Sequence, residues 1–160
     1  MKKLLHIFAF IQMSILGCAQ NQTYDEKLDK LYNKTVPLIN ADSVPEGAAF
    51  LDTRELEEFE VSHIPGATFT GYKDFNTDSL KHLSKSDTIV VYCSVGYRSE
   101  RIGEKLQKMG FSNVYNLYGG IFSWKNSGKS VENSDGEETE QVHTYNKAWS
   151  KWLTRGEKVY

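Results

Sequence analysis

The sequence has few cysteines, no excess of positive charge and no long apolar run, and each shortage excludes a class of protein. Its 19 Lys and Arg residues against 21 Asp and Glu residues give a formal net charge of −2. A nucleic-acid-binding domain normally carries a basic face, so this balance argues against a nucleic-acid partner. The length of 160 residues is close to that of one ordinary domain.

The two cysteines, Cys18 and Cys93, and four scattered histidines limit what the chain can bind. Structural zinc sites need several Cys and His ligands at short spacings, and the sequence shows no such cluster. The acidic residues at 135–140 lack the regular alternation of an EF-hand and are expected to form a solvated loop. We therefore expect neither a metal nor a cofactor.

The N-terminus has the pattern of an export signal. Met1–Lys3 is basic, Leu4–Leu16 is mostly apolar, and Gly17 directly precedes Cys18. The apolar stretch is too short for a comfortable transmembrane helix and is typical of a secretory signal peptide. The junction resembles a bacterial lipobox, although Leu16 is a less usual residue two positions before the cysteine.

The lipobox resemblance implies that residues 1–17 are removed and that lipid on Cys18 anchors the chain to a membrane. We then expect an exported bacterial lipoprotein on the periplasmic or cell-surface side. An ordinary signal peptide, or an uncleaved anchor with Cys18 incidental, is the alternative. With Cys18 lipidated, Cys93 is the sole thiol of the mature protein. An unpaired thiol in an oxidising compartment is either buried and inert or retained for its chemistry.

Apolar strands alternate with amphipathic helices through the middle of the chain. Thr88–Tyr92 gives the strongest strand signal, because it is β-branched and almost continuously apolar, like a buried parallel strand. The alternation predicts an α/β domain with a mostly parallel sheet flanked by helices. The expected strands are 36–39, 48–51, 67–69, 88–92 and 114–117, and the expected helices are 21–34, 54–60, 99–109 and one from 121.

The mature chain divides into three parts in this interpretation. Residues 18–34 form the lipid tether and an N-terminal helix, residues 35–128 form the α/β domain, and residues 129–160 form a C-terminal extension. We keep this last name below.

The extension regains apolar character near its end. Trp149, Trp152 and Leu153 stand at helical spacing and predict a C-terminal helix that packs on hydrophobic surface. The alternative is that His143, Tyr145 and Trp149 approach the functional site.

The residues after the strongest strand, Cys93–Ser99, form a reactive-cysteine loop that runs straight into a helix. Sites of open parallel sheets lie at the carboxyl ends of the strands. A cysteine there meets backbone N–H groups and the positive end of a helix dipole, which favour the thiolate over the thiol. Gly96 allows the tight turn, and Arg98 offers a forked cationic donor to an anionic substrate. Ser99 can cap the helix and donate toward the sulfur.

We assign Cys93 as the nucleophile and Arg98 as the substrate-binding charge. A core cysteine that merely ends a buried strand is the plain alternative, but it does not explain why Gly, Arg and Ser follow so closely. The rest of the loop is expected to bind the substrate through a cradle of backbone N–H groups: Ser94, Val95, Gly96, Tyr97 and Ser99.

This loop resembles the active-site loop of single-domain rhodanese-like proteins. Three other segments match that family in the right order, and the match runs from about residue 36 to residue 125. They are Leu51–Glu55 with Phe59, His63–Ala67, and Tyr118–Ile121 with Trp124. The resemblance implies a doubly wound α/β domain. It also implies a sulfurtransferase in which Cys93 takes sulfane sulfur from a small donor such as thiosulfate. The resulting persulfide passes its sulfur to cyanide, a thiol or an unidentified protein acceptor.

Two other functions remain open at the same loop. Cysteine-dependent phosphatases and arsenate reductases place a longer gap between Cys and Arg, whereas four residues separate Cys93 from Arg98 here. The shorter gap favours sulfur over a tetrahedral oxyanion. The other alternative is a sulfur or redox sensor, or a binding module, that keeps the loop without turnover.

Asp52 and Arg54 are candidates for a supporting role beside the loop, because Asp52 ends a strand expected next to the cysteine strand. The alternative is a capping residue followed by a solvated first-turn arginine. His63 could serve as a general base, but it precedes Ile-Pro-Gly and is expected to belong to a structural turn.

Overall fold

A computed structural model of the chain describes residues 22–160. The expected signal peptide and its lipidation site, Cys18, lie outside the described residues. Within residues 22–160, no helix has the length and apolar character needed to cross a membrane.

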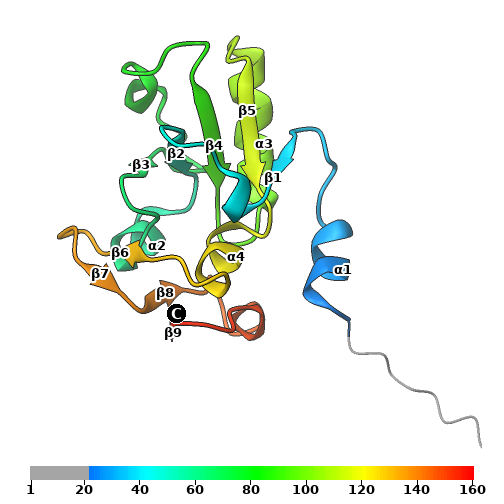
Figure 1. Ribbon diagram of the computed structural model, residues 1–160, viewed down its shortest axis with the longest axis vertical. Helices are drawn as coiled ribbons and strands as arrows, with labels where there is room; N and C mark the ends of the chain where they lie inside the picture. Colours follow the sequence, from blue (N-terminus) through cyan, green and yellow to red (C-terminus); the bar gives the residue numbers. More distant parts are fainter. Residues whose placement is uncertain (1–21) are drawn as a thin grey trace, which may run out of the picture.

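The centre of the molecule is a five-stranded sheet in the order β1-β5-β4-β2-β3, and every neighbouring pair is parallel. The mostly parallel α/β sheet predicted above is therefore confirmed. Figure 1 shows the carboxyl ends of β4 and β5 pointing toward the extension. The strands are β1 Leu38–Ile39, β2 Ala49–Asp52, β3 Thr68–Phe69, β4 Thr88–Tyr92 and β5 Asn113–Leu117.

Strand β4 carries both halves of the core, because its side chains alternate between two hydrophobic clusters. Val90 and Tyr92 belong to one cluster, whereas Ile89 and Val91 belong to the other, and all four are fully buried. Successive side chains of a strand point to opposite faces, so a strand covered on both faces must be apolar throughout. This is why Thr88–Tyr92 could be located from the sequence alone.

The helices cover both faces of the sheet. Ile102 and Leu106 of α3 pack in one cluster, whereas Leu28 of α1 and Phe122 of α4 pack in the other. The α-helices are α1 Tyr24–Asp29, α2 Leu56–Val61, α3 Tyr97–Lys108 and α4 Gly120–Asn126, and short 3-10 helices span Ala41–Ser43, Thr77–Leu80 and Ser150–Trp152.

The N-terminal segment is more than a tether. Its helix is shorter than the predicted 21–34 and begins after Thr23, whose side chain and that of Glu26 form a reciprocal capping box. Leu28 and Tyr32 are buried in the same cluster as Tyr92 of β4. This segment therefore belongs to the core of the domain.

The prediction of a packed helix in the extension is wrong. The side chain of Asn146 accepts hydrogen bonds from the backbone N–H groups of Ala148 and Trp149, as an N-cap residue does, but the side chain of Asn126 accepts the N–H groups of Thr154 and Arg155 and ends the turn after Trp152. The turn contains a 3-10 helix of three residues, and Gly156 at φ 95° then turns the chain back to pair with β8. The strands of the extension are β6 Val131–Glu132, β7 Glu138–Thr139, β8 Gln141–His143 and β9 Glu157–Val159.

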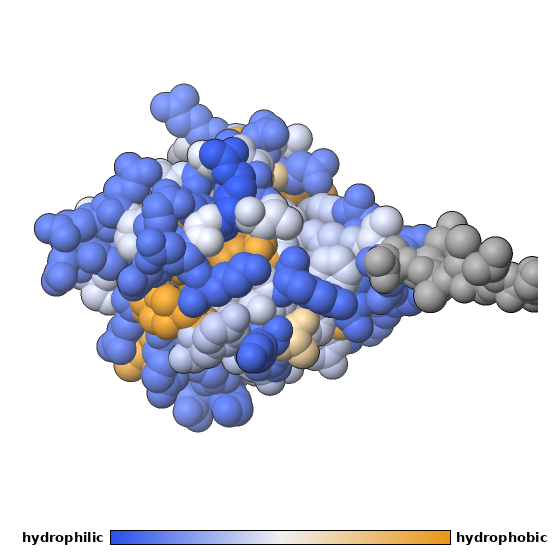
Figure 2. All heavy atoms as spheres, turned by 90° about the horizontal axis from the view of Figure 1, so that it is seen from below, coloured by the Kyte–Doolittle hydropathy of each residue, from blue (hydrophilic) through white to orange (hydrophobic). Residues whose placement is uncertain are grey.

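The extension nevertheless packs on the domain, as its apolar residues suggested. Val131, Val142 and Leu153 are buried in the cluster that contains α1 and α4, and β8 contacts α2. The extension lies along the lower edge of the molecule in Figure 1. Seen from that side in Figure 2, the surface is mostly hydrophilic, and its apolar areas are small and surrounded by hydrophilic side chains.

Candidate active site

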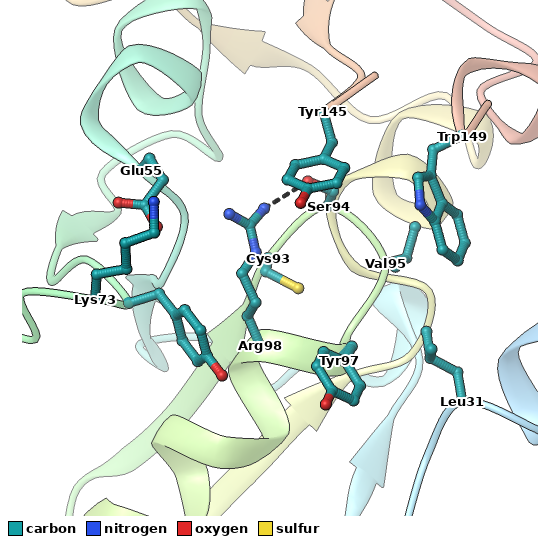
Figure 3. Close-up of a pocket in the computed structure, with 11 residues that line it drawn as sticks. Leu31, Glu55, Lys73, Cys93, Ser94, Val95, Tyr97, Arg98, Tyr145 and Trp149 are labelled. Carbon is teal, nitrogen blue, oxygen red and sulfur yellow. Dashed lines mark hydrogen bonds and ion pairs between the residues drawn. The ribbon is translucent and has the colours of Figure 1, made fainter. Parts of the chain in front are cut away.

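Cys93 follows β4 directly and lies at the carboxyl edge of the sheet, where the sequence placed it. The residue is 1% exposed, and its Sγ accepts a hydrogen bond from the N–H of Gly96 at 3.1 Å. Figure 3 shows the sulfur pointing into the pocket between Arg98 and Val95. This bond holds the sulfur at the start of α3.

Two glycines give the loop its shape. Gly96 has a φ of 98°, and a Cβ there would collide with the side chain of Tyr32. Gly120 has a φ of 57°, and a Cβ there would collide with the carbonyl oxygen of Cys93. Both positions combine a left-handed backbone with a close approach, so only glycine fits them without rearrangement.

The carbonyl groups at the start of the loop are held by α4. The carbonyl oxygen of Cys93 accepts the N–H of Ile121 at 2.9 Å, and that of Ser94 accepts the N–H of Phe122 at 3.3 Å. These donors are among the N–H groups at the beginning of α4 that have no partner within the helix. The start of α4 therefore anchors the loop from behind.

Tyr32 and Asn116 hold the next two carbonyl groups. The hydroxyl of Tyr32 donates to the carbonyl of Val95 at 2.6 Å and accepts the N–H of Gly119 at 2.8 Å. The Nδ2 of Asn116 donates to the carbonyl of Gly96 at 2.9 Å. The Oδ1 of Asn116 accepts the hydroxyl of Ser99 at 2.7 Å. Ser99 is therefore bonded to Asn116 and does not donate to the sulfur.

Arg98 is engaged by a partner that sequence reasoning missed, Glu58 of α2. Its Nη1 and Nη2 donate to the two carboxylate oxygens of Glu58 at 2.6 and 2.8 Å. Ser94 joins the pair, since its hydroxyl donates to Glu58 at 2.9 Å and accepts from Arg98 at 3.0 Å. A bidentate pair of this kind neutralises the charge that Arg98 was expected to offer a substrate.

Burial and ion pairing act in opposite directions on the Glu58 carboxylate. Burial raises its pKa, but the hydrogen bonds and positive charge of Arg98, together with the charge of Arg54, outweigh burial, so the pKa lies below 4.5. The same pairing raises the pKa of Arg98 against the effect of its own burial. Both groups are therefore charged at neutral pH.

Asp52 and Arg54 lie beneath the site and do not line the pocket. Both are fully buried, and Arg54 Nη2 contacts Asp52 and the carbonyl of Ser62 at 2.6 Å each. The alternative of a solvated first-turn arginine is wrong. The pair connects the end of β2 to the end of α2, the helix that carries Glu58.

The pocket above Cys93 has a volume of about 310 Å³. Segments far apart in the sequence supply its walls, and Figure 3 shows their side chains gathered around Cys93. Of the expected loop residues, Gly96 and Ser99 are absent from the lining. The lining residues are Leu31, Glu55, Tyr72, Lys73, Cys93, Ser94, Val95, Tyr97, Arg98, Tyr145 and Trp149.

The alternative that the extension reaches the site is correct for Tyr145 and Trp149. His143 lies beside them, and its Nδ1 accepts the N–H of Tyr145 at 3.1 Å. Burial lowers the pKa of His143, opposed by the charge of Glu58. His63 is outside the pocket lining and stacks on the ring of Phe59 with the ring centroids 3.9 Å apart, which fits the structural role expected for it.

Among residues 22–160, no cluster of three or more His, Cys, Asp or Glu side chains is placed to hold a metal ion. The site described above consists of one thiol, backbone amides and paired charges.

Comparison with known proteins decides the family. The model of the rhodanese-like domain matches residues 24–127. The chain belongs to the rhodanese-like domain family. This rhodanese-like chain is 34% identical over 79 residues to YrkF of Bacillus subtilis, an inferred sulfur carrier protein. It is 35% identical over 86 residues to the tRNA uridine(34) hydroxylase of Yersinia pestis. The matched segments cover 49% and 50% of this chain but only 42% and 24% of those relatives.

Solved structures give the same fold. The BH2092 protein of Bacillus halodurans matches with a TM-score of 0.56 and 27% identity, over 69% of this chain and 84% of that one. The rhodanese-like domain of the Anabaena Alr3790 protein matches with a TM-score of 0.55 and 27% identity, over 61% and 79%. The thiosulfate sulfurtransferase of Pseudomonas aeruginosa, at 22% identity over 61% of this chain and 20% of that one, shares the fold with a TM-score of 0.55.

Replacing Tyr32 by Phe should destabilise the protein by about 1–3 kcal/mol, because it leaves the buried carbonyl of Val95 and the N–H of Gly119 without their shared partner. The matched control is Tyr118→Phe, which removes a hydroxyl that donates to Asp25 in an exposed position. Urea-induced unfolding of both variants provides the measurement. Equal losses in the two variants would contradict the bridging role.

The Glu58 carboxylate should make stability depend on pH below about 5. Its pKa is lower in the folded chain than in the unfolded chain, so its stabilisation is complete above the unfolded value of 4.5. It is lost as pH falls through the folded value. Glu58→Gln lacks this contribution, and the difference in unfolding free energy between wild type and variant should shrink as pH falls. A constant difference from pH 7 to pH 3 would argue against it.

Proposed function

We propose that the protein is a sulfurtransferase that moves sulfane sulfur from a donor such as thiosulfate to a thiol or cyanide through a persulfide on Cys93. The observation that carries the proposal is the position of the thiol. Its Sγ lies at the base of a pocket, at the carboxyl edge of the sheet, and accepts the N–H of Gly96 at 3.1 Å. Membership of the rhodanese-like family and the resemblance to YrkF support the same chemistry.

The reaction needs two displacements at sulfur. The Cys93 thiolate attacks the outer sulfur of thiosulfate, the S–S bond of the donor breaks, and sulfite leaves with the bonding pair. The enzyme then holds Cys93–S–S⁻. An acceptor thiol forms a bond to the outer sulfur, yields a persulfide and returns Cys93 to its thiolate. The N–H of Gly96 supports the thiolate at the start and end of the cycle.

Phosphatase or arsenate-reductase chemistry at the same loop fits the site less well. An arginine that binds a tetrahedral dianion needs free donors, whereas Arg98 directs two of its nitrogens to Glu58. The Glu58 carboxylate would also repel the dianion at short range. The charge arrangement agrees with the four-residue gap between Cys93 and Arg98.

The full chain and its Cys93→Ala variant, incubated with thiosulfate and cyanide, provide the direct test. With thiosulfate alone the wild type should gain the mass of one sulfur atom at Cys93, and added cyanide should remove that sulfur as thiocyanate; Cys93→Ala should do neither. A parallel incubation with an aryl phosphate tests the alternative. Phosphate release without a sulfur adduct would refute the sulfurtransferase proposal, and inactivity with both substrates in folded protein would favour a sensor or binding module.

We further propose that the protein is an exported lipoprotein held at a membrane by lipid on Cys18. The proposal rests on the N-terminal pattern, in which Gly17 and Cys18 follow a basic start and a short apolar stretch. Labelling of expressing bacteria with a radioactive fatty acid should mark the wild type, and Cys18→Ala should remain unlabelled. A label that survives this substitution would exclude lipidation at Cys18.

A further inference from the structure

We infer that Tyr145 and Trp149 of the extension are specificity-determining residues that bind an apolar carbon group of an organic sulfane donor. The inference rests on the proposed sulfur transfer at Cys93 and names the class of donor that the pocket prefers. Such donors are thiosulfonates, R–SO₂–S⁻, and organic persulfides, R–S–SH, in which R is an aromatic or larger alkyl group.

The walls of the pocket are mostly apolar or aromatic. Around the sulfur, Tyr145 and Trp149 face Leu31 and Tyr97 across the pocket mouth in Figure 3. A pocket of about 310 Å³ is in the range of sites that bind small organic molecules. A small inorganic anion would leave most of these apolar walls uncovered. An apolar group covers them and gains the free energy of removing that surface from water.

The charges of the pocket point the same way. Arg98 is paired with Glu58 at 2.6 Å, and the other lining cation, Lys73, lies 3.8 Å from Glu55. An inorganic dianion would have to compete with these carboxylates for both cations. A donor with a single negative charge, or a neutral persulfide, needs less compensation from these two cations. Its apolar group can instead pack on the apolar walls.

Tyr145 is held in place by its backbone. It has a φ of 63° and is one of two non-glycine residues with positive φ in the described part of the chain. Such a conformation is unfavourable for a tyrosine and persists only where the surroundings impose it. Its N–H donates to His143 Nδ1 at 3.1 Å, and the N–H of the preceding Thr144 donates to the carbonyl of Val159 at 2.8 Å.

The ring of Tyr145 lies at the pocket mouth beside Arg98. It is 54% exposed, and its ring lies 5.2 Å from the guanidinium carbon of Arg98, which allows a cation–π contact. Trp149 is similarly positioned, with the ammonium group of Lys27 5.1 Å from its ring. Both rings are therefore placed before a donor arrives.

The reaction with an organic donor follows the same displacement at sulfur as the reaction with thiosulfate. The Cys93 thiolate attacks the outer sulfur of R–SO₂–S⁻, the S–S bond breaks, and the sulfinate R–SO₂⁻ leaves with the electron pair. With R–S–SH the leaving group is the thiolate R–S⁻, and the proton stays on the new persulfide. No external oxidant or reductant takes part in either step.

The test compares two donors of equal charge, benzenethiosulfonate and methanethiosulfonate, on the full chain with cyanide as the acceptor. The wild type should favour the benzene compound in kcat/KM through a lower KM. Tyr145→Gly tolerates the positive φ but removes the ring, and should reduce this preference roughly threefold to tenfold. Tyr145→Phe keeps the ring and should retain the preference.

Tyr160→Ala is the matched control, because Tyr160 is an exposed tyrosine of the same extension that does not line the pocket. It should leave both kcat/KM values unchanged. Trp149→Ala should also reduce the preference, provided that thermal unfolding shows this variant to be folded. If it is not folded, Tyr145→Gly alone decides the test, because Tyr145 is exposed and its loss should not unfold the protein.

The results separate the inference from the proposed function. A wild type without preference for the benzene compound, or a Tyr145→Gly variant that keeps the wild-type preference, overturns the inference while Cys93 still gains sulfur by intact mass. Failure of Cys93 to gain sulfur from thiosulfate and from both thiosulfonates overturns the proposed function and the inference together.

Discussion

Four consecutive carbonyl groups, from Cys93 to Gly96, each accept a hydrogen bond from another segment of the chain, and the site depends on this constraint. The donors are the N–H groups of Ile121 and Phe122, the hydroxyl of Tyr32 and the amide of Asn116. The two polar groups of a peptide unit point in opposite directions, so drawing the carbonyls outward turns the amides inward. The bond from the Gly96 N–H to the Cys93 sulfur is the visible result.

The same constraint brings the charged groups of the site into contact, so that each charge is paired within the site. The loop positions Ser94 and Arg98 against Glu58, and the buried Asp52–Arg54 pair fixes the end of the helix that carries Glu58. Removing one member of such a network leaves an uncompensated buried charge, which is strongly destabilising. Arg98 therefore both lines the pocket and, through Glu58, helps to hold α2 against the loop.

Local patterns were enough to predict the sheet and the place of Cys93 at its carboxyl edge. Strand β4 was located to the residue because burial on both faces demands an unbroken apolar run, and the loop was recognisable because its Cys, Gly, Arg and Ser are neighbours in the sequence. The partners of that loop could not be found in this way. Glu58 lies 40 positions from Arg98, and Tyr32 lies 63 positions from Val95.

The extension shows a different limit of sequence reasoning. Trp149, Trp152 and Leu153 have the spacing of an α-helix, but a short 3-10 turn also directs such residues to one side. The side chain of Asn126 ends the turn here, because its Nδ2 donates to the carbonyl of Trp152 and its Oδ1 accepts the N–H groups of Thr154 and Arg155. Periodicity reports which residues are buried, and it does not report how the backbone hydrogen bonds are completed.

The origin of the pocket walls has a consequence for how this fold can change. The groups that hold the loop carbonyls come from one set of residues, whereas Tyr72, Tyr145 and Trp149 contribute walls without holding any of those carbonyls. Substitutions at these three positions can alter which molecules enter the pocket while Cys93 stays in place. The shape of the pocket and the position of the thiol are separately adjustable, so evolution or a protein engineer can change one without rebuilding the other.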